Sequence, residues 1–148
     1  MATVLFHISD VNTAIGASLT RYEQVAMASL VTTATENIAQ VMYRTPGVFS
    51  NLYINIRTND RAASTLRTCV NAANGNQVVT ITESTTGKFE DTSNTDIVSA
   101  GQEWALQIVT GAGGTTFTYS VIALLFAADT NTVTRYANES VAMTAAST

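Results

Sequence analysis

The sequence predicts an all-β protein, an antiparallel β-sandwich of the jelly-roll type that forms a single domain. Three observations predict it. Apolar and polar residues alternate with period two in many short segments, clusters of Gly, Asn, Ser and Thr separate these segments, and threonine is the commonest residue. The β-branched side chain of threonine fits a pleated strand better than a helix. With 148 residues, the chain has the length of one domain with one core.

Nine segments show the alternation that is typical of strands. The predicted strands are Thr3–Ser9, Ala26–Thr33, Ala39–Arg44, Ser50–Thr58, Thr65–Asn71, Gln77–Glu83, Glu103–Thr110, Thr116–Phe126 and Val133–Tyr136. The segment Thr35–Met42 is also compatible with a helical turn, because its residues Glu36, Ala39 and Gln40 tolerate one.

Turn chemistry marks the connections between these strands. Asn74 and Gly75 are the residue pair that a tight hairpin prefers, because both tolerate a positive φ. The segments Gly111–Gly114 and Asp91–Asp96 are predicted to be looser connections.

The chain is expected to fold as one domain over residues 1–148. Within it we expect an N-terminal strand and arm over 1–25, a sandwich core over 26–130 and a C-terminal arm over 131–148. The segments Asp10–Arg21 and Asn131–Thr148 are polar or rich in small residues, so they are interpreted as arms that reach a neighbour.

Two strands allow core positions to be assigned from alternation alone. Side chains two residues apart on a strand share a face, and in each of these strands one face is aliphatic or aromatic. The predicted core residues are Leu52, Ile54, Ile56, Trp104, Leu106 and Ile108. Trp104 is assigned to the core rather than to a carbohydrate-binding surface because its partners on that face are aliphatic.

The strand Thr116–Phe126 differs from the others because both of its faces are apolar in the second half. Alternation places Tyr119, Val121, Ala123 and Leu125 on one face and Ile122, Leu124 and Phe126 on the other. One sandwich covers only one face of such a strand, so an arm of the same chain or a second subunit has to cover the other. The residues predicted to form this interface are Tyr119, Val121, Ile122, Leu124, Leu125 and Phe126.

The residues that carry chemistry are too few for an enzyme site. His7 is the only histidine and Cys69 the only cysteine, which excludes a multi-histidine metal site, and no Gly-x-Ser-x-Gly nucleophile motif is present. Cys69 is interpreted as a small buried hydrophobe and Gly111–Gly114 as a hairpin loop rather than a phosphate loop. Glu90, Asp91 and Asp96 carry oxygen ligands, but in no known calcium-loop spacing. The sequence therefore predicts no catalytic activity, no metal and no cofactor.

Charge and hydropathy exclude two classes of partner. The net charge is −4 and the seven basic residues are scattered, so no nucleic-acid surface is expected. The longest wholly apolar run, Val121–Ala128, is far shorter than the roughly 20 residues that span a bilayer, and the N-terminus has no basic leader. We expect no membrane contact and a protein that is soluble where it is made.

A succession of motifs resembles the jelly-roll virion proteins of tailed phages. The similarity runs through Thr45–Ile54, Thr65–Asn71 and Thr85–Thr92, and continues with the pair Ala100-Gly101 and the hairpin Thr110–Gly113. It covers roughly residues 45 to 126, and Gln102 departs from the acidic residue that usually follows the Ala-Gly pair. These motifs are turns and core positions, so they are more specific for fold than for function.

The resemblance implies a structural role in a virion. It implies a cement, or decoration, protein on the capsid surface, made in the host cytoplasm, which forms a homo-oligomer, expected to be a trimer, and binds the major capsid protein. The alternative is a receptor- or glycan-binding jelly-roll module of a tail or fibre, for which Tyr43 and Tyr53 would be the stacking platforms.

Overall fold

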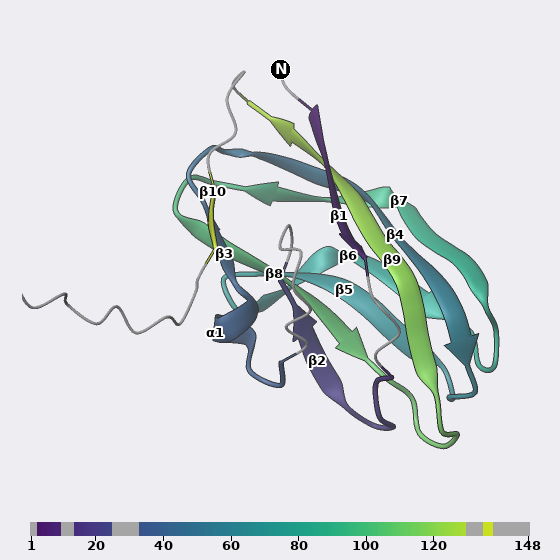
Figure 1. The fold of residues 1–148 in the computed structure, drawn as a ribbon. Coiled ribbons are helices and arrows are strands. Elements are labelled where there is room, and N and C mark those ends of the chain that lie inside the picture. Colours follow the sequence, from purple (N-terminus) through teal and green to yellow (C-terminus); the bar gives the residue numbers. More distant parts are fainter. Residues whose placement is uncertain (1–2, 10–13, 25–32, 130–134, 138–148) are drawn as a thin grey trace, which may run out of the picture.

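The computed structural model describes residues 3–9, 14–24, 33–129 and 135–137, and within them the chain forms two antiparallel sheets packed face to face (Figure 1). Sheet A has the strand order β1-β9-β4-β7, with β1 Thr3–Ser9, β9 Phe117–Ala128, β4 Gly47–Asn59 and β7 Gly87–Val98. Sheet B has the order β10-β3-β8-β5-β6, with β10 Arg135–Ala137, β3 Val41–Tyr43, β8 Gln102–Val109, β5 Ser64–Val70 and β6 Ala73–Ile81. A further strand, β2 (Thr20–Glu23), pairs with β8, and a short helix, α1 (Glu36–Ala39), precedes β3.

The connections between strands have jelly-roll topology. From β3 to β9, each connection crosses from one sheet to the other, except the hairpin that joins β5 to β6. The order β1-β9-β4-β7 therefore lies opposite the order β3-β8-β5-β6, as in an eight-stranded jelly roll. The predicted fold class, an antiparallel all-β sandwich, is confirmed.

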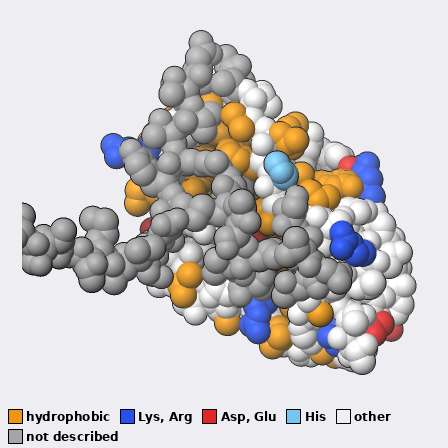
Figure 2. Space-filling view, viewed as in Figure 1, with side chains coloured by type: hydrophobic (Ala, Val, Ile, Leu, Met, Phe, Trp, Pro, Cys, Tyr) orange, Lys and Arg blue, Asp and Glu red, His pale blue; other side chains and the backbone are white. Residues whose placement is uncertain are grey.

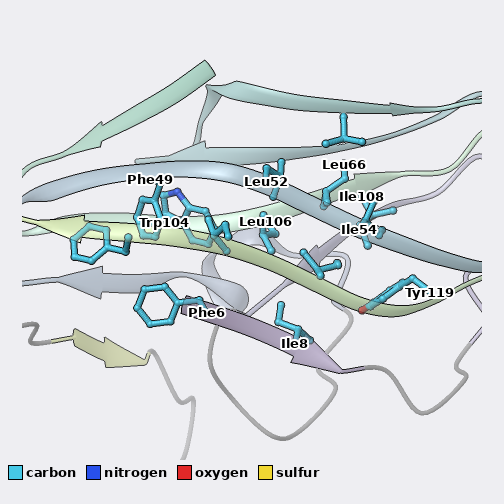
Figure 3. Packing of buried hydrophobic residues seen from close by; sticks show 14 of the residues in the cluster. Phe6, Ile8, Phe49, Leu52, Ile54, Leu66, Trp104, Leu106, Ile108 and Tyr119 are labelled. Atoms are coloured by element: carbon cyan, nitrogen blue, oxygen red, sulfur yellow. The ribbon is translucent and has the colours of Figure 1, made fainter. Parts of the chain in front are cut away.

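The core lies between the two sheets. All six residues assigned to it by alternation are at most 2% exposed. Figure 3 shows side chains from both sheets pointing into the space between them, among them Leu52, Ile54, Trp104, Leu106 and Ile108. At one end of the core, aromatic rings pack together: Trp104 stacks on Phe49 with 4.5 Å between ring centroids, and Tyr43 meets Phe49 edge-on at 5.1 Å. Trp104 is fully buried, so its indole is no surface for a sugar.

Two strands were not predicted, and their residues explain why. β7 spans Gly87–Val98 and includes Asp91–Asp96, which the sequence suggested was a loose connection. Its inward positions include the buried carboxylates Asp91 and Asp96, so hydrophobic alternation does not reveal it. β2 takes part of the segment interpreted as an arm, because Thr20–Glu23 pairs with β8.

The tight turn between β5 and β6 is displaced from its predicted place. Val70 pairs with Ala73, so the two-residue loop is Asn71-Ala72, with φ of 50° and 60°. Both values suit the type I′ turn that two-residue hairpins favour. The pair Asn74-Gly75 lies inside β6 instead, where a Cβ on Gly75 would collide with the Thr68 hydroxyl. Gly75 is needed for this close approach rather than for a turn.

Some predicted elements fall partly or wholly outside the described residues. The predicted strand Ala26–Thr33 does so except for Thr33, which forms an isolated bridge with Tyr22. Of the predicted strand Val133–Tyr136, the structure describes Arg135 and Tyr136 in β10. The segment Thr35–Met42 contains both alternatives, since α1 ends at Ala39 and β3 begins at Val41.

Candidate interaction surface

The outer face of sheet A carries the apolar side chains that the core does not use. On β9 the side chains of Ile122, Leu124 and Phe126 are buried, whereas Val121 and Leu125 are half-buried and point away from the core. The predicted interface set is therefore divided, and only two of its six members lie on the outer face. The structure thus settles which face of β9 belongs to the core.

Tyr119 corrects the predicted grouping of β9 residues. Alternation placed it on the same face as Val121 and Leu125, but its side chain is 1% exposed and lies in the core. The register between β4 and β9 shifts at Asn55/Ile56, so Ile56 pairs with Tyr119 while Asn55 pairs with Val121. A bulge of this kind reverses the face of every residue beyond it.

Other strands of sheet A extend this outer apolar surface. Leu5 on β1 pairs with Leu125 and is 60% exposed. In the next row, Ala127 pairs with Val48 on β4, and Val48 pairs with Ile97 on β7. Ile97 is 76% exposed. We call this set the outer stripe; its members are Leu5, Val48, Ile97, Val121, Ala123, Leu125 and Ala127. Figure 2 shows hydrophobic side chains gathered beside the single histidine on this side of the molecule. Apolar side chains that cross every strand of a sheet on its solvent side are typical of a contact surface.

The two tyrosines considered as sugar platforms have different environments. Tyr43 is fully buried, so the prediction that its ring is a surface platform is wrong. A strand of three residues is too short for alternation to show which side faces out. Tyr53 lies half-buried on the outer face of β4, with the Lys88 ammonium 5.9 Å from its ring centroid. Lys88 also pairs with Glu90 at 2.9 Å. Of the two, Tyr53 alone presents its ring near the surface.

A shallow pocket of about 450 Å³ opens between β6 and β7. Its lining combines the apolar side chains of Val70, Ala73 and Ile97 with the amides of Asn74 and Asn76, and contains no aromatic ring. It therefore lacks the stacking surface on which sugar recognition usually depends.

Asp96 closes the edge between the two sheets beside this pocket. Its carboxylate, 2% exposed, accepts hydrogen bonds from the Thr68 hydroxyl, from the Asn76 amide N–H at 2.6 Å and from the Gln77 side chain at 3.2 Å. The Gln77 side-chain oxygen in turn accepts the Leu52 N–H, 3.2 Å away. These bonds join β5 and β6 of sheet B to β7 and β4 of sheet A, so the carboxylate has a structural role.

Asp91 performs the same task further along β7. It accepts the Val78 N–H of β6 and the N–H groups of Ser93 and Asn94, all at 3.0 Å. Burial opposes ionisation, but the hydrogen bonds from Asn94, Val78 and Ser93 outweigh it and lower the pKa of Asp91. Among the described residues, no three His, Cys, Asp or Glu side chains are arranged to hold a metal ion.

The hydrogen bonds around Asp91 and Asp96 form one polar clamp. A second polar clamp fixes the glycine-rich loop between β8 and β9. The buried guanidinium of Arg61 donates to the carbonyls of Gly113 and Gly114, to Thr115 O at 3.0 Å and to Ile15 O at 3.1 Å. The predicted hairpin is wrong, because this loop crosses from β8 in sheet B to β9 in sheet A. Its carbonyls face a cation, so it is not arranged to bind a phosphate.

Asp60 completes the clamp from the neighbouring position. Its carboxylate accepts the Thr115 N–H at 2.8 Å, the Thr115 hydroxyl at 2.9 Å and the Thr116 N–H at 2.6 Å. The backbone hydrogen bonds from Thr115 and Thr116 are the main reason why the pKa of Asp60 falls to about 2.

This pKa predicts a specific change in acid stability. Because the folded-state pKa is lowered, the stabilisation from Asp60 is present above the usual aspartate pKa of 3.8 and is lost as pH falls towards 2. Asp60→Asn should lower the urea midpoint at pH 7, and its difference from wild type should vanish near pH 2. Urea unfolding at pH 7, 4 and 2 checks this, and a difference of constant size would contradict it.

Cys69 lies beneath α1 and β2 on the other side of sheet B. It is 2% exposed and packs with Ala39 and Ala105, with Tyr22 against them. Burial raises the pKa of the Cys69 thiol to about 12, so the thiol is protonated at neutral pH and is no nucleophile.

Comparisons with known proteins add no family. No protein-family model matches the chain, and no curated protein matches it significantly. The described part of the chain contains no helix with the length and hydropathy of a membrane span.

Proposed function

We propose that the chain is a structural virion protein, a cement or decoration protein that binds the outside of a phage head and stabilises it. The observation that carries the proposal is the order of the strands, β1-β9-β4-β7 opposite β3-β8-β5-β6, which is the jelly-roll fold that the resemblance implies. The resembling motifs support it further, because they supply Asn51, Asn71, Gly87, Gly101 and Gly113, all with positive φ. These residues set the bulge and turns of the fold that the resemblance implies.

The polar clamps fit the same role. Asp91 and Asp96 tie the two sheets together along one edge, and Asp60 and Arg61 fix a loop at the end of the sandwich. Asp91, Asp96 and Arg61 are buried, and buried polar groups that are hydrogen-bonded make a structure rigid. A rigid block can bridge neighbouring capsid subunits and resist pressure from inside.

The proposal is tested on purified virions. Antibody labelling should place the protein on heads at hundreds of copies per particle, and heads that lack it should disrupt at a lower temperature than decorated heads. A ligand that binds only the assembled state must stabilise that state. Label confined to tails or fibres would instead support the receptor-binding alternative, for which Tyr53 is the remaining aromatic candidate. Equal heat stability of bare and decorated heads would refute cementing.

We further propose that the chain self-associates, as a trimer, through the outer stripe. The contact residues from the predicted interface are Val121 and Leu125, with Leu5 and Val48 beside them. Each aliphatic side chain that becomes fully buried contributes about 1.5–3 kcal/mol, so a few per chain can hold subunits together without an ion pair.

Two adjacent residues of β9 provide a matched pair of variants. Leu124→Asp should unfold the chain, because Leu124 is 1% exposed and a carboxylate there would be buried without a partner. Leu125→Asp should stay folded but become monomeric, because Leu125 faces outward. Light scattering gives the oligomeric state and circular dichroism the fold. A wild type that is monomeric at micromolar concentration would refute the oligomer, and an unfolded Leu125→Asp would mean that the same chain covers the stripe.

A further inference from the structure

β6 and β7 are edge strands of different sheets, and hydrogen bonds join them. In the described part of the chain, β6 is the last strand of sheet B and β7 the last strand of sheet A (Figure 1). An edge strand presents backbone N–H and C=O groups with which a strand of another chain can pair. β6 has nine residues, so it is long enough to accept such a strand.

Side chains of β7 accept two backbone N–H groups of β6. The N–H of Val78 donates to the Asp91 carboxylate at 3.0 Å, and the N–H of Asn76 donates to the Asp96 carboxylate at 2.6 Å. In the other direction, the side-chain amide of Asn76 donates to the carbonyl of Thr95 on β7, 3.1 Å away. To pair with β6 here, the carbonyl oxygens of an added strand would have to replace these carboxylate oxygens.

Both edge strands are also irregular at this place. Residues 75–77 of β6 lie opposite the single residue Thr68 of β5, and residues 92–94 of β7 lie opposite the single residue Asn51 of β4. Such bulges interrupt the regular ladder and bend the strand. Bulges and inward-pointing charged side chains are two means by which natural sheets protect their edges, and both are present where β6 meets β7.

We propose that Asp91 and Asp96 keep β6 closed to strand addition, so that two copies of the chain do not pair edge to edge. The carboxylates are 7% and 2% exposed, so they lie inside the edge and not in front of it. Without a carboxylate, an N–H of β6 becomes a free donor for the β6 carbonyls of a second copy. The inference does not depend on the outer stripe, because edge pairing uses the backbone of a strand instead of the side chains of a face.

The experiment compares Asp91→Ala with Asp60→Ala by sedimentation of the full chain at rising concentration. Both substitutions remove one carboxylate that accepts backbone N–H groups, and both change the net charge equally, but Asp60 accepts them from a loop. Asp91→Ala should form species larger than wild type, whereas Asp60→Ala should keep the wild-type size. Adding Val78→Pro to Asp91→Ala should restore the wild-type size, because proline has no N–H to donate. The Val78 side chain is 39% exposed, so a ring has room there.

Hydrogen exchange identifies the edge that pairs. In a dilute sample of Asp91→Ala, the Val78 amide should exchange about tenfold or more faster than in wild type, because its hydrogen bond to a charged group is lost. In a concentrated sample the exchange of this amide should slow again, because the second copy now accepts its N–H. The amides of the central strand β8 should stay protected in both samples.

Each other outcome overturns the proposal. An Asp91→Ala chain that is folded and keeps the wild-type size at every concentration would show that the carboxylate only braces the sheets. Equal association of Asp60→Ala would assign the effect to lost charge, and association that persists with Val78→Pro would place it at another surface. Rapid exchange throughout β8, or an Asp91→Ala chain already unfolded when dilute, would show that the carboxylate is needed for the fold itself. A monomeric wild type refutes the proposed trimer and leaves this inference unaffected.

Discussion

Trp104→Ala is expected to lower the free energy of unfolding by about 3–5 kcal/mol, the usual cost of deleting a buried large aromatic side chain. Trp104 is fully buried, stacks on Phe49 with their planes 22° apart, and belongs to β8, which pairs with β2, β3 and β5. Its loss would leave a cavity between the sheets at the aromatic end of the core. Urea unfolding monitored by circular dichroism gives the change.

Two comparison variants separate packing from other effects. Trp104→Phe keeps a ring against Phe49 and removes an indole N–H that has no hydrogen-bond partner among the described residues, so it should cost less than the alanine variant. Tyr53→Ala, on the outer face, should change stability by no more than about 0.5 kcal/mol. A Trp104→Ala variant as stable as Tyr53→Ala would show that Trp104 does not hold the core together.

The sandwich was predictable because the central strands alternate clearly. Leu52, Ile54 and Ile56 follow the bulge at Asn51, and beyond it β4 is regular as far as Ile56, so period two locates the core face. β8 behaves the same way through Trp104 and Leu106. In such strands one face is buried by the opposite sheet, and the sequence carries that information directly.

β7 could not be predicted, because two of its inward positions hold hydrogen-bonded carboxylates instead of apolar side chains. Asp91 and Asp96 face inward, but the groups that satisfy them, such as Val78 N–H and Asn76 N–H, belong to another strand. In the sequence, these two acidic residues lie among Thr and Ser, and such a composition is typical of turns. The pairing that makes them strand residues is a tertiary property.

The outer stripe was only partly predictable for a related reason. Alternation in β9 predicted that one of its two apolar faces needs a partner, and the predicted interface included Val121 and Leu125. Leu5, Val48 and Ile97 come from three other strands, each as a single apolar residue on the outer face. Leu5 and Ile97 are exposed and Val48 is half-buried, and one such residue by itself indicates nothing. Strand pairing brings them into two adjacent rows, so only the topology shows that they form one surface.

Arg61→Met should destabilise the fold by about 2–4 kcal/mol, the second large effect, because it removes the donor for four carbonyls. Arg61 is 3% exposed, and its guanidinium joins the β8–β9 loop to Ile15, which lies just before β2. Methionine preserves much of the side-chain length and its apolar stem contacts. The loss of stability should therefore come from the carbonyls left without a donor, and water will hydrogen-bond to some of them.

Arg61→Lys is the matched control for this prediction. It keeps the charge next to Asp60 but has a compact ammonium in place of the planar fork, so it cannot reach Ile15 O and Thr115 O together with the two glycine carbonyls. We expect its stability to lie between those of wild type and Arg61→Met. Hydrogen exchange locates the effect: the Thr115 and Thr116 amides, which donate to Asp60, should exchange faster in Arg61→Met. A methionine variant within about 0.5 kcal/mol of wild type would show that the loop holds its shape without the guanidinium. In that case Asp60 alone would account for the order of the loop, and Asp60→Asn should then accelerate exchange of the same two amides.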